Sequence, residues 1–459
     1  MNLFEIKNIE NFFFIGIAGD GMSAIAQYLA GIGKNVSGSD RQFSHGNKTF
    51  RQKQLEKEGI KCFPQDTSGI TGDIETVVIS SAIEPSVPEY KLAIEKNIPV
   101  IMRSDLLAAI SKTKKTIAVA GTSGKSTVTA MIYHIMNFAG KNPSLITGAG
   151  LTDISKTGKI GNAVAGKGDF LIIEADESDG SVIKYNPYIG IILNIDKDHK
   201  EIPELMQLFG VFADNSKNLT VNNDTERTKK LSQKKKNNFG FSSDSGFRIN
   251  NFKQAGFNIL FRINGIDFKL SLIGRHNAEN VAAAVAACSV AGINIETSAD
   301  ALKSYRGIFR RHQIIEDKNG ITLIDDYAHN PAKLAASVRA CQFSGRKLTV
   351  WFQPHGFAPV KFLKNEYIKE ISEALRDDDE IWMSEIYYAG GTVDRNISAD
   401  DLVQGIRKNG KKAFFVKDRK FFPYKIKNEL KYGDIILLTG ARDPSLKDFA
   451  EYVKNIFFE

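Results

Sequence analysis

The chain has 459 residues, too many for a single hydrophobic core, so two or three domains are expected. Hydrophobic residues make up 42% and charged residues 25%, and no apolar run approaches the ~20 residues of a membrane span, which excludes a protein built on membrane-spanning helices. The net charge of +8 suits anionic ligands such as nucleotides, but no recognition motif for nucleic acid accompanies it.

The amino terminus and the cysteines both favour a cytoplasmic protein. Residues 1–7 lack the charged and then apolar layout of a signal peptide. Cys62, Cys288 and Cys341 are odd in number and far apart, which is typical of reduced thiols rather than of a disulfide framework or a zinc site.

The first block of the chain alternates strands and helices. Strands are expected at 12–16, 36–39 and 76–80, with a helix over 22–29, and this order predicts a parallel α/β sheet. The glycine loop at 16–21 lies between a strand and a helix, where it could receive a diphosphate. Asp40, after the next strand, could bind a ribose or a base. A polar linker is expected at 111–115.

The second block opens on the strongest local motif. The apolar strand 116–120 leads directly into Gly-Thr-Ser-Gly-Lys-Ser-Thr at 121–127, and a helix follows. In such a loop the backbone N–H groups surround phosphate oxygens, Lys125 reaches the β- and γ-phosphates, and Ser126 binds Mg²⁺. The spacer before the Gly-Lys pair has two residues instead of the usual four. The motif predicts a nucleotide site.

More polar groups follow the other strands of this block. Residues 174–179, Glu-Ala-Asp-Glu-Ser-Asp, come after the strand 170–173, and His199 comes after the strand 189–193. The carboxyl ends of parallel strands border the ligand crevice, so these carboxylates suit Mg²⁺ and His199 could take a metal role. Beyond them, Asn264-Gly265 predicts a hairpin within 257–268, and an alanine-rich helix is expected over 278–291.

The third block opens near residue 313, with strands expected at 321–324, 348–352, 380–383 and 435–438. Polar segments again follow strands, at 325–331 and at Gln-Pro-His 353–355, and they indicate the wall of a site. Arg310 and Arg311 lie at the junction with the second block, where an arginine could move onto a transferring phosphate.

Taken in order, these motifs resemble the Mur ligase family, which builds the peptide of bacterial cell-wall precursors. The resemblance covers nearly the whole chain and is strongest to members that join L-alanine to UDP-N-acetylmuramate. The segments that carry it are 14–23, 37–40, 80–83, 121–127 with its short spacer, 174–179, 198–199, 274–277, 310–311 and 325–331.

The resemblance implies three α/β domains. These are a Rossmann-like UDP-sugar-binding domain at 1–112, a central P-loop ATPase-like domain with a mixed sheet at 113–312, and a Rossmann-like domain at 313–459 that binds the amino acid and closes over the others. The implied reaction uses ATP to phosphorylate the muramyl carboxylate, and the amine of an amino acid, L-alanine favoured, then displaces phosphate. A monomer or homodimer is expected, with small-molecule substrates only.

The family motifs also imply individual roles. Lys125, Glu174 and His199 match catalytic positions, and Ser126, Glu174 and His199 match metal ligands. Gly19, Asp40 and Arg103 fall near the expected UDP site. The residues implied in ATP binding are Gly121, Thr122, Ser123, Gly124, Lys125, Ser126, Thr127, Asn277, Asn280, Arg311 and Asp326.

Several positions depart from the pattern of the alanine-adding members. Ser123 replaces a histidine, Lys200 replaces a methionine, and no arginine stands between His355 and Lys361, where arginines are usual. Because a carboxylate is best held by an arginine fork, Arg442 is a candidate replacement. Two alternatives stay open: a recycling ligase that joins a ready-made peptide to the same sugar nucleotide, and a catalytically silent nucleotide-binding regulatory paralogue.

Overall fold

The computed structural model describes residues 6–44, 46–197, 200–232, 237–344, 346–388, 395–443 and 445–458. The chain forms two compact units. The first comprises Met1–Phe252, Phe261–Leu270 and Ala278–Ile308, and the second comprises Lys253–Leu260, Ser271–Asn277 and Phe309–Glu459. The predicted boundary at residue 112 falls inside the first unit, and the division at 112 and 312 stays a prediction. Within the described residues, no helix is long and apolar enough to cross a membrane.

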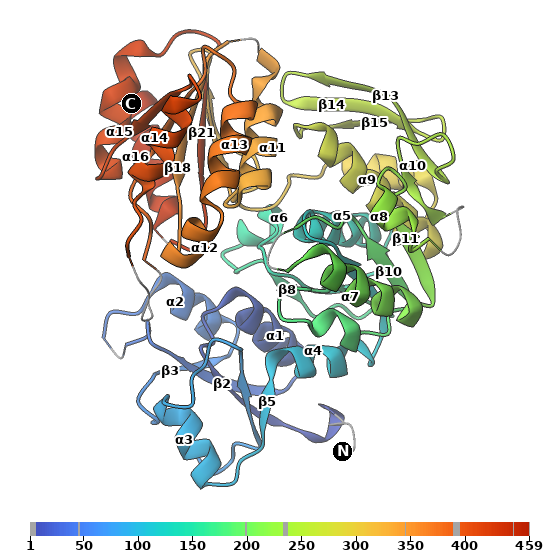
Figure 1. The fold of residues 1–459 in the computed structure, drawn as a ribbon. Coiled ribbons are helices and arrows are strands. Elements are labelled where there is room, and N and C mark those ends of the chain that lie inside the picture. Colours follow the sequence, from blue (N-terminus) through green and yellow to red (C-terminus); the bar gives the residue numbers. More distant parts are fainter. Residues whose placement is uncertain are drawn as a thin grey trace. The chain divides into compact units, whose positions relative to one another are not determined.

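The first sheet has the strand order β3-β2-β1-β4-β5, and all its strand pairs are parallel, as predicted. Its strands β2, β3 and β5 are labelled in Figure 1. Successive residues of the central strand face opposite sides: Phe12 and Phe14 pack in one core cluster, whereas Phe13 and Ile15 pack in the other. The elements of this part are η1 Ile6–Asn8, β1 Asn11–Ile15, α1 Asp20–Gly31, β2 Asn35–Asp40, α2 Phe50–Lys57, β3 Lys61–Pro64, β4 Thr76–Ile79, α3 Pro88–Glu95, β5 Val100–Met102 and α4 Arg103–Ser111.

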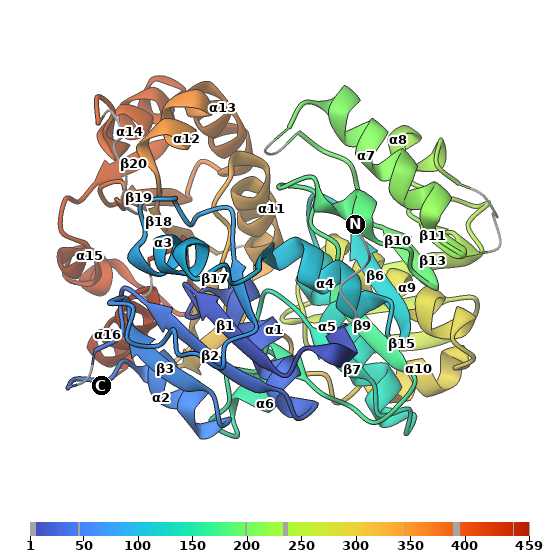
Figure 2. The same ribbon diagram turned by 90° about the horizontal axis from the view of Figure 1, so that it is seen from below.

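The second sheet has the order β11-β10-β6-β9-β7-β8 (Figure 2). Its pairs are parallel except for β7 with β8, which is antiparallel, so the predicted mixed sheet is confirmed. The elements are β6 Lys115–Ala120, α5 Lys125–Phe138, β7 Ser144–Ile146, α6 Thr152–Ser155, β8 Ala163–Val164, β9 Phe170–Glu174, η2 Ser181–Lys184, β10 Ile189–Ile192, α7 Ile202–Asn215, β11 Asn218–Val221, α8 Glu226–Lys229, α9 Arg275–Val290 and α10 Ile295–Leu302.

The segment predicted as a polar linker, 111–115, is short and anchored. Ser111 ends α4 and Lys115 begins β6, so only three residues lie between the two elements. The Lys114 ammonium donates to the carbonyl oxygens of Gly166 and Gly168, both at 2.7 Å, and to the Ser144 hydroxyl at 3.1 Å. Lys114 therefore anchors the connection between α4 and β6 to the second sheet. The polar residues around it in the sequence did not predict these hydrogen bonds.

A smaller sheet follows, with the order β12-β13-β14-β15. Its strands are β12 Phe239–Gly240, β13 Phe247–Ala255, β14 Asn258–Ile263 and β15 Ile266–Leu270. Asn264 and Gly265 connect the last two strands with φ angles of 49° and 89°. Two consecutive left-handed residues are the geometry of a type I′ turn, so the predicted hairpin is confirmed.

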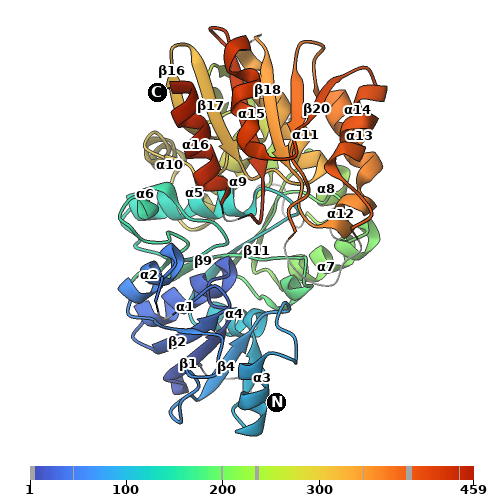
Figure 3. The ribbon, with the colours of Figure 1, turned by 90° about the vertical axis from the view of Figure 1, so that its left-hand side faces the viewer.

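The last sheet has the order β16-β17-β21-β18-β19-β20, parallel except for β16. Val350 packs with α11, α13 and α14, whereas Trp351 packs with α15 and α16, so helices cover both faces (Figure 3). The elements are β16 Gln313–Lys318, β17 Ile321–Asp326, α11 Pro331–Cys341, η4 Gln342–Ser344, β18 Leu348–Gln353, α12 Phe357–Phe362, α13 Lys364–Ala374, β19 Glu380–Met383, α14 Ala399–Lys408, β20 Lys412–Phe415, η5 Arg419–Phe421, α15 Phe422–Ile426, η6 Lys427–Glu429, β21 Ile435–Gly440 and α16 Leu446–Phe458.

Candidate active site

The glycine loop between β6 and α5 has the strand–loop–helix form that the sequence predicted. Gly121 and Gly124 have φ angles of 136° and 85°, which residues with a side chain rarely adopt. A Cβ atom on Gly124 would also lie 2.7 Å from Oδ1 of Asn280 in α9. Helix α5 begins at Lys125, and Ser126 is buried in its first turn. The loop thus presents a helix N-terminus beside Asn280, as anion binding requires.

Asn194, just after β10, braces this loop from the side. Its Oδ1 accepts hydrogen bonds from the Thr122 hydroxyl and from the Ser123 backbone N–H, both at 2.8 Å. Its Nδ2 donates to the Ser123 carbonyl oxygen at 3.1 Å. Asn194 could not be recognised from the sequence, because an asparagine after a strand carries no signal of its own.

Lys125 is held by acidic side chains from the segment after β9. Its Nζ lies 2.6 Å from Glu177 Oε2 and 3.6 Å from Asp176 Oδ1, and it donates to the Gly121 carbonyl oxygen at 2.8 Å. Burial lowers the pKa of Lys125, but these carboxylates, Glu177 first, raise it more, so the ammonium stays charged. A bound phosphate would compete with Glu177 for it.

Glu177 is the buried member of this acidic segment. Its side chain is only 4% exposed. Burial raises the pKa of Glu177, and the attraction of Lys125 offsets this only in part. For the more exposed Asp176, burial is outweighed by Lys125 and by hydrogen bonds from Ser178, which lower its pKa. The sequence placed these acids near the loop, but which of them meets Lys125 required the structure.

Glu174 ends β9, beside Val119 of the loop strand. Its Oε1 accepts a hydrogen bond from the Gly148 N–H at 2.7 Å and another from the Thr147 hydroxyl. These bonds orient the carboxylate at the same sheet edge as Ser126.

The predicted metal residue His199 lies outside the described residues. Within the described ranges, no group of three or more His, Cys, Asp or Glu side chains could hold a metal ion.

The residues predicted for UDP binding lie around β1 and β2 in the same unit. Gly19 is the N-cap of α1. Asp40 is buried, and its Oδ2 accepts from the Ala18 N–H at 3.1 Å, so it also holds the glycine loop in place. Arg103 begins α4 and pairs through Nη2 with Asp179 Oδ2 at 3.1 Å. This ion pair connects the first sheet to the acidic segment 174–179.

A second bridge between the first two sheets was not foreseen. The Gln27 amide donates to Asn162 Oδ1 at 2.8 Å, and the Asn162 amide donates to the Asp20 carbonyl oxygen at 2.9 Å. Both side chains are buried. Because Asp20 begins α1, this bridge fixes the helix that follows the predicted diphosphate loop.

The other predicted nucleotide residues belong to the second unit. Arg310 is buried and makes a two-point ion pair with Asp325, at 2.8 and 3.2 Å, and also donates to the Gly440 carbonyl oxygen at 2.9 Å. Arg311 lies over the Tyr327 ring at 5.1 Å. Asp326 is buried and accepts from the His312 N–H at 3.0 Å. Arg310 is therefore structural, and Arg311 is the more available of the two arginines.

Asn277, also in the second unit, donates through Nδ2 to the Ile273 carbonyl oxygen at 2.7 Å. The predicted nucleotide contacts of Asn277, Arg311 and Asp326 stay predictions.

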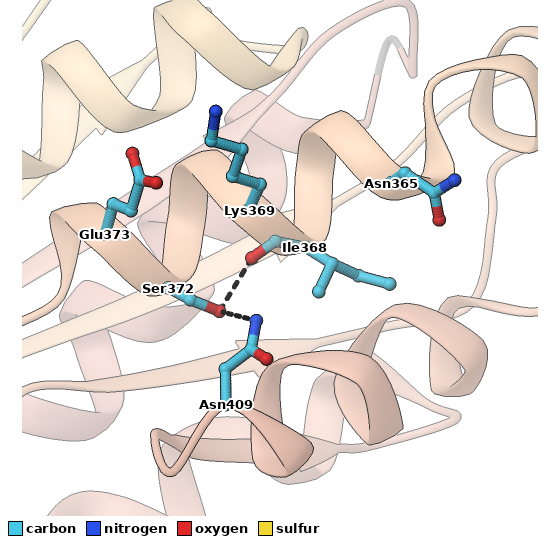
Figure 4. Close-up of a pocket in the computed structure, with 6 residues that line it drawn as sticks. All are labelled: Asn365, Ile368, Lys369, Ser372, Glu373 and Asn409. Atoms are coloured by element: carbon cyan, nitrogen blue, oxygen red, sulfur yellow. Dashed lines mark hydrogen bonds between the residues drawn. The ribbon is translucent and has the colours of Figure 1, made fainter.

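Two hollows lie in the second unit. One, of about 360 Å³, has in its lining Asn409 and Ser372, which are joined by a hydrogen bond, while the charged groups of Lys369 and Glu373 point away from that contact (Figure 4). Asn409 precedes β20, so this hollow lies toward the amino ends of the strands, away from the edge where ligands bind such sheets. The other, of about 460 Å³, is lined by Phe357, Glu385, Arg395, Asn396, Ile397, Ser398 and Asp401.

Comparisons with known proteins agree along most of the chain. Models of the Mur ligase family match in three places: the catalytic domain at residues 11–115, the middle domain at 119–288 and the glutamate ligase domain at 310–442. UDP-N-acetylmuramate–L-alanine ligase of Dictyoglomus turgidum is 36% identical, over 95% of this chain and 94% of that protein. The enzyme of the same name from Carboxydothermus hydrogenoformans is 33% identical, over 93% of each.

Solved structures give the same picture. The UDP-N-acetylmuramate–alanine ligase of Thermotoga maritima superposes with a TM-score of 0.79 at 25% identity, over 97% of this chain and 98% of that one. A murein peptide ligase from Psychrobacter arcticus superposes with a TM-score of 0.67 at 18% identity, over 98% of each chain, which is a likeness of fold.

Proposed function

The chain belongs to the Mur ligase family, and on this premise we propose that it joins L-alanine to UDP-N-acetylmuramate at the expense of ATP, in the cytoplasmic synthesis of peptidoglycan precursors. Full-length relatives at 36% and 33% identity bear the name of that reaction. The observation that carries the proposal is the loop at 121–127, with a charged lysine among carboxylates at the carboxyl edge of a mixed sheet.

The chemistry explains why the enzyme needs ATP. A carboxylate is a poor electrophile, so its oxygen first attacks the γ-phosphorus of ATP, and ADP leaves. The amine of the amino acid then attacks the acyl carbon, phosphate leaves, and the ammonium proton is lost. The ammonium of Lys125 and the N–H groups at the start of α5 would stabilise the negative charge that develops on the transferring phosphate.

We assign the metal role to Mg²⁺ held by the Ser126 hydroxyl and the Glu174 carboxylate, with His199 near a second ion. The donor set fits, because Mg²⁺ prefers oxygen ligands and is usually bound by one or two carboxylates together with substrate phosphates. The oriented Glu174 carboxylate meets this need without a cluster of acids. When bound, the ion would neutralise phosphate charge.

The same resemblance assigns the remaining roles. Gly19, Asp40 and Arg103 would lie at the UDP site, and Asn280 and Asn277 near the adenine. Arg311 and Asp326 would contact the nucleotide from the second unit. These assignments, like a monomeric or homodimeric state, are predictions to be tested by substitution and by measurement of mass in solution.

A direct test is phosphate release with UDP-N-acetylmuramate, ATP, Mg²⁺ and a panel of amino acids and peptides. We expect turnover that depends on L-alanine. Turnover only with an L-alanyl tripeptide would identify the recycling ligase instead. Absence of turnover with every amine, in a preparation that binds ATP, would identify the silent paralogue and refute the proposal.

A further inference from the structure

The proposed reaction needs a receptor for the α-carboxylate of the incoming amino acid, and the usual arginines after Gln-Pro-His are missing. This carboxylate stays charged throughout the reaction, because only the amine reacts. An arginine fork is the side chain best matched to it. A cation from another place in the second unit is therefore expected to take this role.

The 460 Å³ hollow lies where ligands bind in sheets of this type. Strands β18 and β19 are parallel neighbours, with Phe352 opposite Met383, and the hollow is lined by Phe357 at the start of α12, which follows β18, and by residues that follow β19. Two hydrogen bonds join these loops, from the Gly356 N–H to the Tyr387 carbonyl oxygen at 3.0 Å and from the Tyr387 N–H to the Pro354 carbonyl oxygen at 2.8 Å. The hollow is thus a built feature of the carboxyl edge.

Arg395 is the cation of this hollow. Its guanidinium carbon lies 3.9 Å from the centroid of the Tyr388 ring and 6.0 Å from that of Phe357. Phe357, at the start of α12, and Tyr388, after β19, thus each contribute a ring that attracts the guanidinium. Among the described residues, Arg395 makes no ion pair and donates no hydrogen bond, so the N–H groups along its edge are available to a ligand.

The acids of the hollow are already engaged elsewhere. Glu385 accepts from the backbone N–H groups of Ile386 at 2.8 Å and Ala399 at 3.1 Å, and from the Ser398 hydroxyl at 2.8 Å. Asp401 accepts from the Ser398 N–H at 2.9 Å and pairs with Lys364 at 3.1 Å. These bonds hold the carboxylates at the N-terminus of α14, and among the described residues neither carboxylate forms an ion pair with Arg395.

The other arginine near Gln353 is occupied. Arg419 donates to Gln353 at 2.9 Å, to Asp443 at 2.7 Å and to Ser445 at 2.6 Å. Arg442, the replacement considered from the sequence, is exposed on the loop after β21 and does not line the hollow. We propose that Arg395, held by Tyr388 and Phe357, binds the α-carboxylate of the incoming amino acid and so selects a free amino acid over a peptide, whose first residue carries an amide there.

This inference rests on the proposed function, and its test uses L-alanine beside L-alaninamide, which lacks the carboxylate. Loss of a charged two-point contact predicts that Arg395→Ala raises the KM for L-alanine about 10- to 100-fold. The KM for L-alaninamide, the KM for ATP and the amount of hydroxylamine-trapped acyl phosphate should not change. Wild-type enzyme should prefer L-alanine to L-alaninamide, and the variant should lose that preference.

Arg407→Ala is the matched control, because Arg407 also stacks on a ring, Phe414 at 5.6 Å, but lies outside the hollow. It should keep the wild-type KM for L-alanine. The inference is refuted if Arg395→Ala has the wild-type KM for L-alanine and still prefers L-alanine to L-alaninamide. It is also refuted if Arg442→Ala, instead of Arg395→Ala, raises that KM and abolishes that preference. Failure of the wild-type enzyme to use any amine would refute the proposed function itself, so the two failures are distinguishable.

Discussion

Removal of the Asn194 side chain should weaken ATP binding although this residue need not touch ATP. The amide makes three hydrogen bonds to the loop at 121–127, at 2.8, 2.8 and 3.1 Å. A typical hydrogen bond stabilises by about 1 kcal/mol net, and the freed groups of this half-buried loop can partly bond water. We therefore expect Asn194→Ala to destabilise the ordered, ATP-binding conformation of the loop by about 1–3 kcal/mol. This corresponds to a rise of about 5- to 150-fold in the Kd for ATP.

The measurement is titration with ATP, alongside thermal unfolding. Asn218→Ala is the control. Like that of Asn194, the side-chain amide of Asn218 donates one hydrogen bond to a backbone carbonyl, that of Tyr188 at 3.0 Å, but Asn218 lies at the start of β11 and, in the part of the chain that the structure describes, makes no bond to the loop at 121–127. The control should leave the Kd for ATP unchanged. An unchanged Kd in Asn194→Ala, with the variant folded, would show that the loop keeps its shape without this brace.

Three further predictions concern catalysis, stability and pH. Lys125→Ala should lower the rate of acyl-phosphate formation by about 100- to 1000-fold, measured as hydroxylamine-trapped product, and full activity would contradict its phosphate role. Arg310→Met should lower the free energy of unfolding by about 3–5 kcal/mol, because it leaves Asp325 buried without its partner. The double variant Arg310→Met, Asp325→Leu should restore much of that free energy. A loss below about 1 kcal/mol in Arg310→Met alone would show that the ion pair contributes little to stability. Burial and His312 lower the pKa of His276 to about 4, and burial and Lys333 lower that of His329 to about 3, so below pH 6.5 the unfolded chain binds protons that the folded chain does not. The free energy of unfolding should fall by up to about 1.4 kcal/mol per pH unit for each histidine as the pH drops from 6.5 toward 4, and a flat urea-unfolding profile over that range would contradict this.

Most of the secondary structure was predictable, because its signals are local. The strand at 12–16 appears as β1, Asn11–Ile15, and the helix predicted over 278–291 appears as α9, Arg275–Val290. Asn264-Gly265 predicted its turn correctly, since few other residue pairs adopt two left-handed conformations in succession. The connection at 111–115 was predicted, but the hydrogen bonds of Lys114 were not, because they depend on carbonyl groups more than 50 residues away.

The sequence by itself determined the phosphate loop, the order of strands and helices, and the family, since each of these is written in short segments and their spacing. Tertiary structure decided which groups meet. Glu177 rather than Asp176 lies closest to Lys125, Arg310 pairs with Asp325, and Arg395 lies over the rings of Tyr388 and Phe357. Such pairings depend on how distant segments pack at a sheet edge. Local sequence patterns do not predict them, because each pattern spans only a few residues. The loop at 121–127 therefore predicts the nucleotide site from the sequence alone, whereas the position of Arg395 over two rings in the hollow required the folded chain.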